Sequence, residues 1–360
     1  MTEPIAKRNH VERVTLLDVA RHAGVSRATA SLVVRDSPLV AEVTRQRVLA
    51  SMQQLGYVYH RPAASLRTQR SHTVGLIIPD ITNPFFAELT LGVEERLEEA
   101  NYVVVLTNTS ESPEKQNRIL NAMYENNADG ILFCPAVGTS RETFATLFQE
   151  HLPVVLFVRY LFDADSDYVG TDNVLGAELA VEHLITHGHQ RIAFIGGPAT
   201  SSARLERLQG YHTALQRHNL SVDEALLPTS STTREGGHQA ILPLLTLNDP
   251  PTAALCYNDV VAFGVMLGLQ ANGRMPGQDF AVIGFDDIAE AALWHPPLTT
   301  VSIMPCQIGR VAAQRLLELI VRPDDPPRRI ILPPSLVIRT SCGPHDYHVQ
   351  TLDASHSSRA

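Results

Sequence analysis

The sequence has no apolar run that approaches the roughly 20 residues needed to cross a bilayer. The segment before residue 15 carries basic residues but no apolar stretch of signal-peptide length, so we expect neither export nor membrane insertion. Cysteine is scarce, and the four thiols match no metal-binding or redox spacing: Cys134, Cys256, Cys306 and Cys342. Buried free thiols in a reducing cytoplasm are therefore the expectation.

Catalytic fingerprints are also missing. No GxSxG, Walker or GxGxxG motif occurs in its required context, and no nucleophile–base set is visible, so no catalytic residue is expected. His183, His187 and His189 have a spacing that resembles a metal site, but no carboxylate or cysteine completes it. A solvent-facing or capping role is the preferred interpretation, and neither a metal nor another cofactor is expected. Asp286 and Asp287 are adjacent, so they point in different directions and form no acid–base pair.

Acidic residues outnumber basic ones, at 38 against 29, but the excess is uneven. Residues 1–72 hold 11 basic and 5 acidic residues, a charge of +6. This leaves 18 basic and 33 acidic residues, a charge of −15, for the remainder. A basic front end on an acidic body indicates that one end of the protein meets a polyanion.

Residues 15–58 contain three short helical patterns and no strand pattern. Leu17, Ala20 and Ala23 fall on one face of the first helix, and the third runs from about Thr44 to a glycine stop. This part of the chain is therefore expected to be a small all-α domain.

The first two helices meet at the sequence Gly-Val-Ser. Gly24 allows the left-handed backbone of a sharp turn, Val25 can fill the angle between the helices, and Ser26 suits the N-cap of the second. This is the helix-turn-helix arrangement, whose second helix enters the major groove, although an ordinary helical hairpin has the same spacing. The positions able to reach bases or phosphates are Arg27, Ala28, Thr29, Ser31 and Leu32.

Residues 59–71 form a basic linker that contains the short helical pattern PAASLR (62–67). Leu66 is an apolar residue among arginines. A leucine inserted between base steps from the minor groove, with arginines on the phosphates, explains that combination. A plain linker whose leucine packs on a neighbouring domain is the alternative.

From residue 73 the pattern changes to apolar, β-branched runs separated by helix-length segments, which is typical of parallel strands covered on both faces. The runs are TVGLIIP (73–79), YVVVLT (102–107), GILFCP (130–135), PVVLFV (153–158), RIAFIGG (191–197), AALCY (253–257) and FAVIGF (280–285). They predict an α/β core of two doubly wound parallel-sheet subdomains. We place these at about 72–170 and 171–298, with the chain crossing back over 299–340 and a polar tail at 341–360.

A cleft between two such subdomains, at the carboxyl ends of their strands, is the usual place for a small ligand. Phe85 and Phe86 follow the first strand and supply either an aromatic wall or core packing. Polar side chains able to hydrogen-bond into the same cleft are Asn258, Asp286, Arg207 and Arg159. For Arg159, a salt bridge across the cleft is the alternative.

Ten motifs occur in a characteristic order. They are TLLDVARHAGVSRATASLVV (15–34), LGY (55–57), ASLR (64–67), VGLIIPDITNPFF (74–86), ADGILF (128–133), GTDN (170–173), HQRIAFIGG (189–197), YND (257–259), VIGFDD (282–287) and PPLTTV (296–301). Together they make the chain resemble the lac repressor/galactose repressor (LacI/GalR) family over roughly residues 14–340. The resemblance implies a helix-turn-helix DNA-binding domain at 14–58, a hinge helix at 59–71 and a core like that of periplasmic sugar-binding proteins.

The resemblance also implies a function: a bacterial, nucleoid-associated transcriptional repressor. It would bind pseudo-palindromic double-stranded operator DNA as a homodimer under the control of a small effector. The residues expected at DNA are Leu16, Leu17, Ser26, Arg27, Ala28, Thr29, Ser31, Leu32, His60, Arg61 and Leu66. Those expected at the effector are Phe85, Phe86, Arg159, Ser201, Arg207, Thr232, Asn258 and Asp286.

The chain departs from the family pattern in two ways. Leu32 stands where arginine is common and Ala30 where a β-branched residue is common, and leucine makes only apolar contacts with base edges, which changes the expected operator preference. The tail also lacks the leucine heptads of tetrameric members, so a dimer is expected.

A periplasmic-type sugar-binding transport protein also fits the core pattern. The basic first 72 residues and the missing signal peptide favour the regulator. The polar set and the aromatic wall suggest a sugar or sugar derivative as effector, with purines or nucleosides as the other class. Whether the effector releases the protein from DNA or promotes binding is not encoded in any motif.

Overall fold

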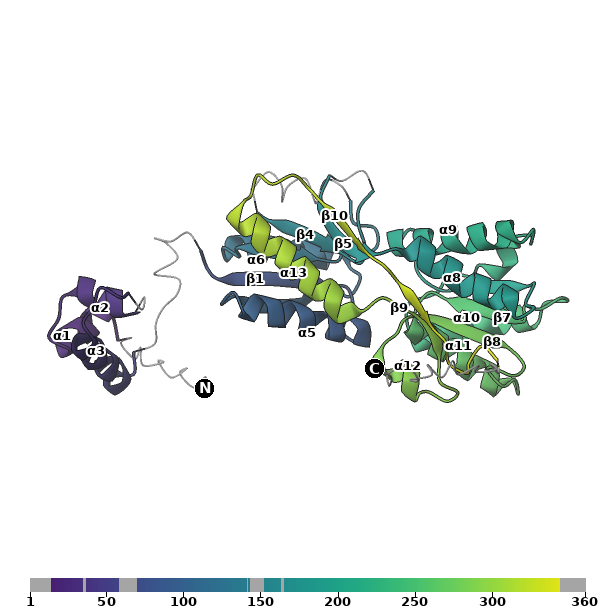
Figure 1. The fold of residues 1–360 in the computed structure, drawn as a ribbon, viewed down its shortest axis with the longest axis horizontal. Coiled ribbons are helices and arrows are strands. Elements are labelled where there is room, and N and C mark those ends of the chain that lie inside the picture. The colour runs from purple at the N-terminus through teal and green to yellow at the C-terminus, as the bar shows by residue number, and fades with distance from the viewer. Residues whose placement is uncertain are drawn as a thin grey trace, which may run out of the picture. The chain divides into compact units, whose positions relative to one another are not determined.

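The computed structural model describes residues 14–34, 37–57, 70–140, 142, 152–162 and 165–343. The chain divides into two units, residues 1–71 and 72–360, which are coloured along the sequence in Figure 1. In the described part of the chain, no helix combines the length and apolar character needed to cross a membrane.

The first unit contains the three expected helices, α1 (Leu16–His22), α2 (Arg27–Val34) and α3 (Glu42–Leu55). Gly24 adopts the left-handed conformation, with φ of 63°. Ser26 caps α2, because its Oγ accepts a hydrogen bond from the Thr29 backbone N–H at 3.0 Å. Val25 packs partly buried against the small core. The predicted turn between two helices is therefore confirmed.

The apolar face of α1 differs from the expected one. Val19, Ala20 and Ala23 are buried, whereas Leu17 is 43% exposed. Because successive helical residues are 100° apart, the buried stripe runs through Val19, and Leu17 lies at its edge.

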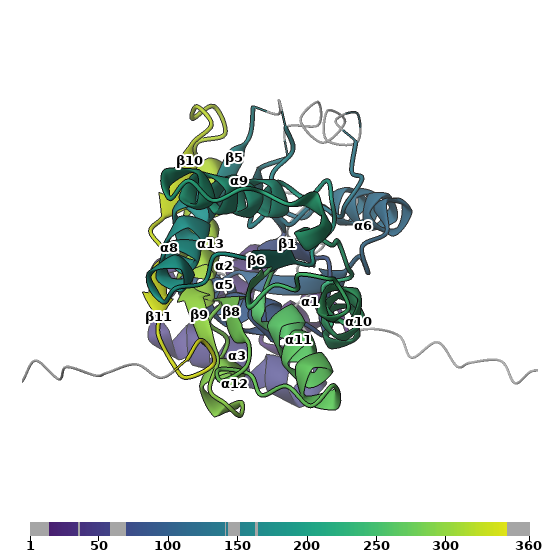
Figure 2. The ribbon, with the colours of Figure 1, turned by 90° about the vertical axis from the view of Figure 1, so that its right-hand side faces the viewer.

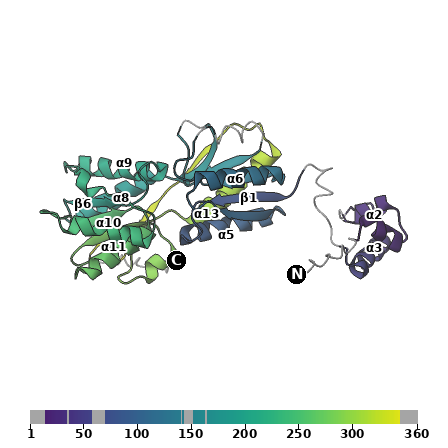
Figure 3. The same cartoon turned by 180° about the vertical axis from the view of Figure 1, so that it is seen from behind.

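The first subdomain of the second unit is a six-stranded sheet in the order β10-β5-β4-β3-β1-β2. Its strands are β1 (Thr73–Ile78), β2 (Val103–Asn108), β3 (Gly130–Phe133), β4 (Val154–Phe157), β5 (Asp167–Thr171) and β10 (Arg329–Leu332). The helices α5 (Pro84–Glu98) and α13 (Pro305–Val321) cover one face, and α6 (Pro113–Glu125) covers the other (Figure 3). Gly92 and Gly309 allow α5 and α13 to pack closely, since a Cβ at either would overlap the facing backbone.

The second subdomain is a five-stranded sheet in the order β11-β9-β8-β7-β6, parallel except for β11. Its strands are β6 (Ile192–Ile195), β7 (Ala253–Cys256), β8 (Ala281–Asp286), β9 (Thr299–Ser302) and β11 (Ser335–Val337). Its helices are α8 (Asn173–Thr186), α9 (Ser202–Arg217), η1 (Glu224–Leu226), α10 (Arg234–Leu245), α11 (Asp259–Ala271) and α12 (Ala289–Leu293). The pairs α8/α9 and α10/α11 lie on opposite faces (Figure 2).

The chain crosses between the subdomains three times, after β5, after β9 and between β10 and β11. The expected crossing at 299–340 begins later, because β9 still pairs with β8. The polar tail also begins later than residue 341. Ser341 is fully buried, and its Oγ donates to the Val282 carbonyl at 2.6 Å. Cys342 is buried beside it, so these two residues belong to the second subdomain.

All seven apolar runs contain strands, but the expectation of cover on both faces is wrong for β2. This strand lies at the sheet edge, and Val103, Val105 and Leu106 are exposed. Its apolar side chains therefore form a surface feature of the first subdomain.

Arg315 ties α13 to the sheet. Its side chain is only 1% exposed, and its Nε donates to Asp167 Oδ1 at 2.5 Å. The same guanidinium reaches Asp325 at 3.4 Å and the Pro326 carbonyl at 3.0 Å. Because the guanidinium charge is buried, the stability of the fold depends on keeping all of these partners.

We expect Arg315→Met to lower the free energy of unfolding by about 3–5 kcal/mol, because it leaves the buried Asp167 carboxylate without its cation. Urea unfolding followed by circular dichroism measures this loss. Arg310→Met on the same helix is the matched control, since Arg310 pairs with Glu95 at the surface and its removal should cost less than about 1 kcal/mol. Equal losses of unfolding free energy in the two variants would contradict the stabilising role of the buried Arg315–Asp167 pair.

Candidate functional sites

The first candidate site is the surface around the start of α2. Ser26, Arg27 and Ala28 are exposed there, as a DNA-reading helix requires. Thr29 is half-buried and its Oγ1 lies 2.9 Å from Ser26 Oγ, so these two hydroxyls satisfy each other at the turn. Arg27 is therefore an accessible cation at this helix end.

The other residues expected at DNA differ in accessibility. Leu17 is exposed, whereas Leu16, Ser31 and Leu32 are partly buried. Leu16 packs against the core of the three helices, so part of its side chain is structural. His60, Arg61 and Leu66 lie outside the described residues.

The second candidate site is a cavity at the carboxyl ends of the strands, between the two subdomains. The structure brings seven of the eight residues expected at the effector into its wall: Phe85, Phe86, Arg159, Arg207, Thr232, Asn258 and Asp286. They come from the first turn of α5, the loop after β4, α9, the loop before α10, the start of α11 and the end of β8. Parallel strands place these loops at one edge of each sheet, which explains the convergence.

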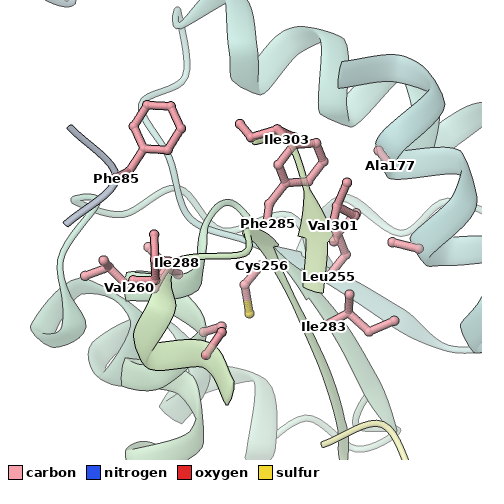
Figure 4. Close-up of a cluster of buried hydrophobic side chains, with 14 of the residues drawn as sticks. Phe85, Ala177, Leu255, Cys256, Val260, Ile283, Phe285, Ile288, Val301 and Ile303 are labelled. Carbon is pink, nitrogen blue, oxygen red and sulfur yellow. The ribbon is translucent and has the colours of Figure 1, made fainter. Parts of the chain in front are cut away.

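The aromatic wall comes from the start of α5. Asn83 caps this helix by accepting from the Phe85 backbone N–H at 3.1 Å, and Pro84 follows at the first helical position. The rings of Phe85 and Phe86 meet edge to face with centroids 5.1 Å apart. Both are buried and both belong to the main apolar cluster, in which Figure 4 shows Phe85 with Phe285 and Ile288. Both proposed roles, ligand wall and core packing, therefore apply.

Arg207 and Asp286 are the central charged pair. Arg207 Nη2 lies 3.8 Å from Asp286 Oδ1, and both side chains are almost completely buried. Arg207 also donates to the Tyr257 carbonyl and, through Nε, to Asn173 Oδ1 at 2.8 Å. Its guanidinium lies 3.7 Å from the centroid of the Phe285 ring. The charge is thus held by a carboxylate, two oxygen acceptors and an aromatic face.

The Asp286 backbone is strained, with φ of 120°. Burial raises the pKa of the Asp286 carboxyl to about 7, although the nearby Arg207 acts in the opposite direction. Behind it, Asp259 is fully buried and accepts from Thr300 Oγ1 at 2.5 Å and from the Ile288 backbone N–H at 2.9 Å. Burial, followed by the charge of Asp286, raises the pKa of Asp259 well above its ordinary value.

Asn258 and Tyr257 complete the second-subdomain wall. Asn258 caps α11, because its Oδ1 accepts from the Val261 N–H at 2.9 Å. Its amide nitrogen therefore remains to donate toward a ligand. Tyr257 is buried with its ring 4.9 Å from the Arg207 guanidinium carbon.

Arg159 faces the cavity and forms a salt bridge, but not the one across the cleft considered above. Its Nη1 lies 2.8 Å from Glu111 Oε1, and both residues belong to the first subdomain. Its buried Nε has no hydrogen-bond partner among the described residues. The preceding Val158 has φ of 63°, an unusual conformation for a β-branched residue, and this turn directs Arg159 inward.

Ser201 does not line this cavity. It lies in an adjoining hollow that shares Arg159 with the first one, and its Oγ is 3.4 Å from the Tyr257 hydroxyl. Ser201 is the N-cap of α9, which begins at the next residue.

Several cavity residues were not predicted: Pro79, Asp80, Asn83, Glu111, Val158 and Tyr257. Four of them lie inside or beside motifs that the sequence analysis had already singled out, namely the segments that follow β1 and β7. Glu111 carries no such signal, because only its contact with Arg159 brings it to the site.

No group of three or more histidine, cysteine or acidic side chains is arranged to hold a metal among the described residues. The three histidines considered above have other contacts. His187 Nδ1 is 2.8 Å from the His183 carbonyl, and His189 Nδ1 is 2.9 Å from Thr252 Oγ1.

We expect Asp286→Asn to flatten the pH dependence of folding stability. The raised pKa of Asp286 means that the folded protein holds this proton more tightly than the unfolded chain does. Stability should therefore fall as the pH rises from about 4 to about 7, by at most about 4 kcal/mol from this group. Urea unfolding at a series of pH values tests this, and identical profiles for the variant and the wild type would contradict it.

Comparisons with known proteins agree with the division of the chain into residues 1–71 and 72–360. Residues 15–59 match "Bacterial regulatory proteins, lacI family", and residues 71–340 match "Periplasmic binding proteins and sugar binding domain of LacI family". The ribose operon repressor of Escherichia coli K12 is 36% identical over 330 residues, covering 91% of this chain and 99% of the relative.

Solved structures extend the likeness to three dimensions. A lac repressor dimer bound to operator and the anti-inducer ONPF has a TM-score of 0.82 at 27% identity, covering 92% of this chain and 99% of that one. A LacI family regulator from Enterococcus faecium with bound ribose has a TM-score of 0.69 at 30% identity, covering 76% of this chain and 99% of that one. The chain belongs to the LacI family of bacterial transcriptional regulators, with a DNA-binding helix-turn-helix domain followed by a sugar-binding domain.

Proposed function

We propose that this protein is a cytoplasmic, nucleoid-associated repressor without enzymatic activity. It binds a pseudo-palindromic operator as a homodimer, and a neutral sugar bound between its subdomains changes its operator affinity. A pentose such as D-ribose is the first candidate effector. The single observation that carries the proposal is that one chain combines a helix-turn-helix domain with a cavity whose buried charges are already paired.

The headpiece supports the DNA part of the proposal. An exposed arginine and alanine begin α2, and no acidic residue lies in its first turn. The helix-turn-helix domain also favours a regulator over a periplasmic transport protein, because transport requires no DNA-binding domain. Leu32 is partly buried, so only part of its side chain is available for an apolar contact such as one with a thymine methyl group.

Two features support a dimer. A pseudo-palindromic operator requires two headpieces related by a two-fold axis. The exposed apolar residues of the edge strand β2 form a surface that monomeric proteins usually avoid. The lac repressor structure compared above is described as a dimer.

The electrostatics of the cavity support a neutral effector. Arg207 is paired with Asp286, and Arg159 is paired with Glu111, so each arginine among the described residues that line the cavity already has a carboxylate partner and is not left for a phosphate. The carboxylate, the Asn258 amide and the guanidinium groups offer directional partners for hydroxyl groups, and Phe86 offers an apolar face. The relative and the solved structure connected with ribose favour a pentose over a nucleoside.

We expect double-stranded DNA selected from a random pool by the full-length protein to contain a pseudo-palindrome. Affinity for it should fall steeply with added salt, because phosphate contacts release counterions. Arg27→Ala should weaken binding and reduce the slope of log K against log salt by about 1. Arg310→Met, which removes a positive charge from the core instead, should leave the slope unchanged. A salt-independent affinity would contradict specific phosphate contact.

We expect D-ribose to bind with an affinity that falls as the pH is lowered through about 7, by up to about tenfold per pH unit. The sign follows because ligand hydroxyls donate to the ionised Asp286 carboxylate, whose pKa is about 7. Asp286→Asn should weaken binding about 10- to 100-fold, since hydrogen bonds to charged groups are the stronger ones. Isothermal titration calorimetry measures both effects.

The matched control is Asp249→Asn, which changes a highly exposed carboxylate on the same subdomain and should bind ribose normally. Wild-type affinity in Asp286→Asn would remove Asp286 from the site. No ribose binding at all would shift the search to nucleosides and sugar phosphates by thermal-shift screening.

A further inference from the structure

One residue of the first subdomain donates two hydrogen bonds to the second beside the cavity. Tyr160 follows β4, and its hydroxyl donates to Glu206 Oε1 at 2.9 Å. Its backbone N–H donates to Ser202 Oγ at 3.1 Å. Both acceptors lie on α9, so we call these two hydrogen bonds the Tyr160 bridge.

The bridge continues to the cavity without interruption. The second oxygen of Glu206 accepts from Asn173 Nδ2 at 2.8 Å, and Asn173 Oδ1 accepts from Arg207 Nε at 2.8 Å. Arg207 then pairs with Asp286. The buried Asn173 amide can satisfy both neighbours only in this orientation, because its oxygen accepts and its nitrogen donates. A shift of Arg207 toward a ligand must therefore be transmitted to Glu206.

The ring of Tyr160 is fixed by its surroundings. The Arg329 guanidinium carbon lies 4.3 Å from the ring centroid, and Arg329 begins β10, the strand that leads back to the second subdomain. Tyr168 packs edge-on against the same ring, with centroids 5.2 Å apart. Burial, together with the charge of Glu206, raises the pKa of Tyr160 to about 12, so the hydroxyl remains a donor at neutral pH.

We propose that Tyr160 is a positioning residue that couples the state of the cavity to the angle between the subdomains. The hydrogen bond to Glu206 spans the two subdomains, so it survives only within a narrow range of the angle between them. Because Glu206 also holds Asn173 and through it Arg207, a ligand on Arg207 strengthens or weakens the bridge. This inference rests on the proposed function, in which a ligand in the cavity alters operator affinity.

The first test measures coupling in the full-length protein with D-ribose as the probe. The quantity is the ratio of operator affinities without and with saturating ribose. We expect Tyr160→Phe, which keeps the ring and removes only the hydroxyl, to reduce this ratio about 3- to 10-fold. Glu206→Gln should have a similar effect, and the double variant should show no further loss, because both changes remove one interaction.

The matched control is Tyr211→Phe. The Tyr211 hydroxyl donates to the Ile192 carbonyl at 2.8 Å, within the second subdomain and outside the cavity lining, so it makes no bond between the subdomains. Its loss should leave the ratio unchanged. Coupling that is unchanged in Tyr160→Phe, or reduced equally in Tyr211→Phe, would overturn the proposal.

A second measurement needs no ligand. Spin labels on Cys306, the exposed native cysteine of α13, and on Gln216→Cys at the exposed end of α9 report the distance between the subdomains. Tyr160→Phe should broaden this distance distribution, whereas Tyr211→Phe should not. If ribose leaves the operator affinity of the wild type unchanged, the proposed effector is wrong. The distance measurement alone then tests whether the Tyr160 bridge restricts the angle between the subdomains. An identical distribution in Tyr160→Phe then overturns it.

Discussion

The buried pairing of Arg207 with Asp286 is the interaction on which the cleft depends. Two buried charges are stable only when attraction and hydrogen bonds replace the water that each has lost. Here the guanidinium uses the Tyr257 carbonyl, the Asn173 amide and the Phe285 ring for that purpose. The result is a cavity with little net charge and many directional groups. Such a cavity offers directional hydrogen-bonding groups to a ligand, which is the basis of the neutral effector proposed above.

Sequence reasoning predicted seven of the eleven strands that the structure describes and missed four. A parallel strand covered on both faces must be apolar on both, and this requirement produced the runs that define β1, β3, β4 and β6 to β8. The missed strands β5, β9, β10 and β11 contain polar residues such as Asp167 and Thr299, although β5 and β9 lie inside their sheets. Asp167 is buried only because Arg315 reaches it from a helix far along the chain. Pairings of that kind leave no local pattern.

The same limit applies to the site residues. Asn258 and Asp286 were predicted because each follows an apolar run at a sheet edge, where topology alone makes loops converge. Glu111 and Asn173 were missed because their roles consist of contacts with Arg159 and Arg207. Ser201 was placed in the cavity because its loop was expected there, but at the N-cap of α9 its hydroxyl lies in the adjoining hollow, 3.4 Å from the Tyr257 hydroxyl.

Backbone strain occurs at the cavity wall as well as elsewhere in the described chain. Val158 and Asp286, which line the cavity, and Asp287 next to Asp286 have positive φ, and such residues cost about 1–3 kcal/mol each when they are not glycine. The cost is sustained by surrounding contacts: Asp259 accepts from the Ile288 N–H, and Arg339 pairs with the Asp287 carboxylate at 2.8 Å. A wall held by these contacts favours a response in which the subdomains rotate about their three connections, and this gives weight to the hydrogen bonds that span them.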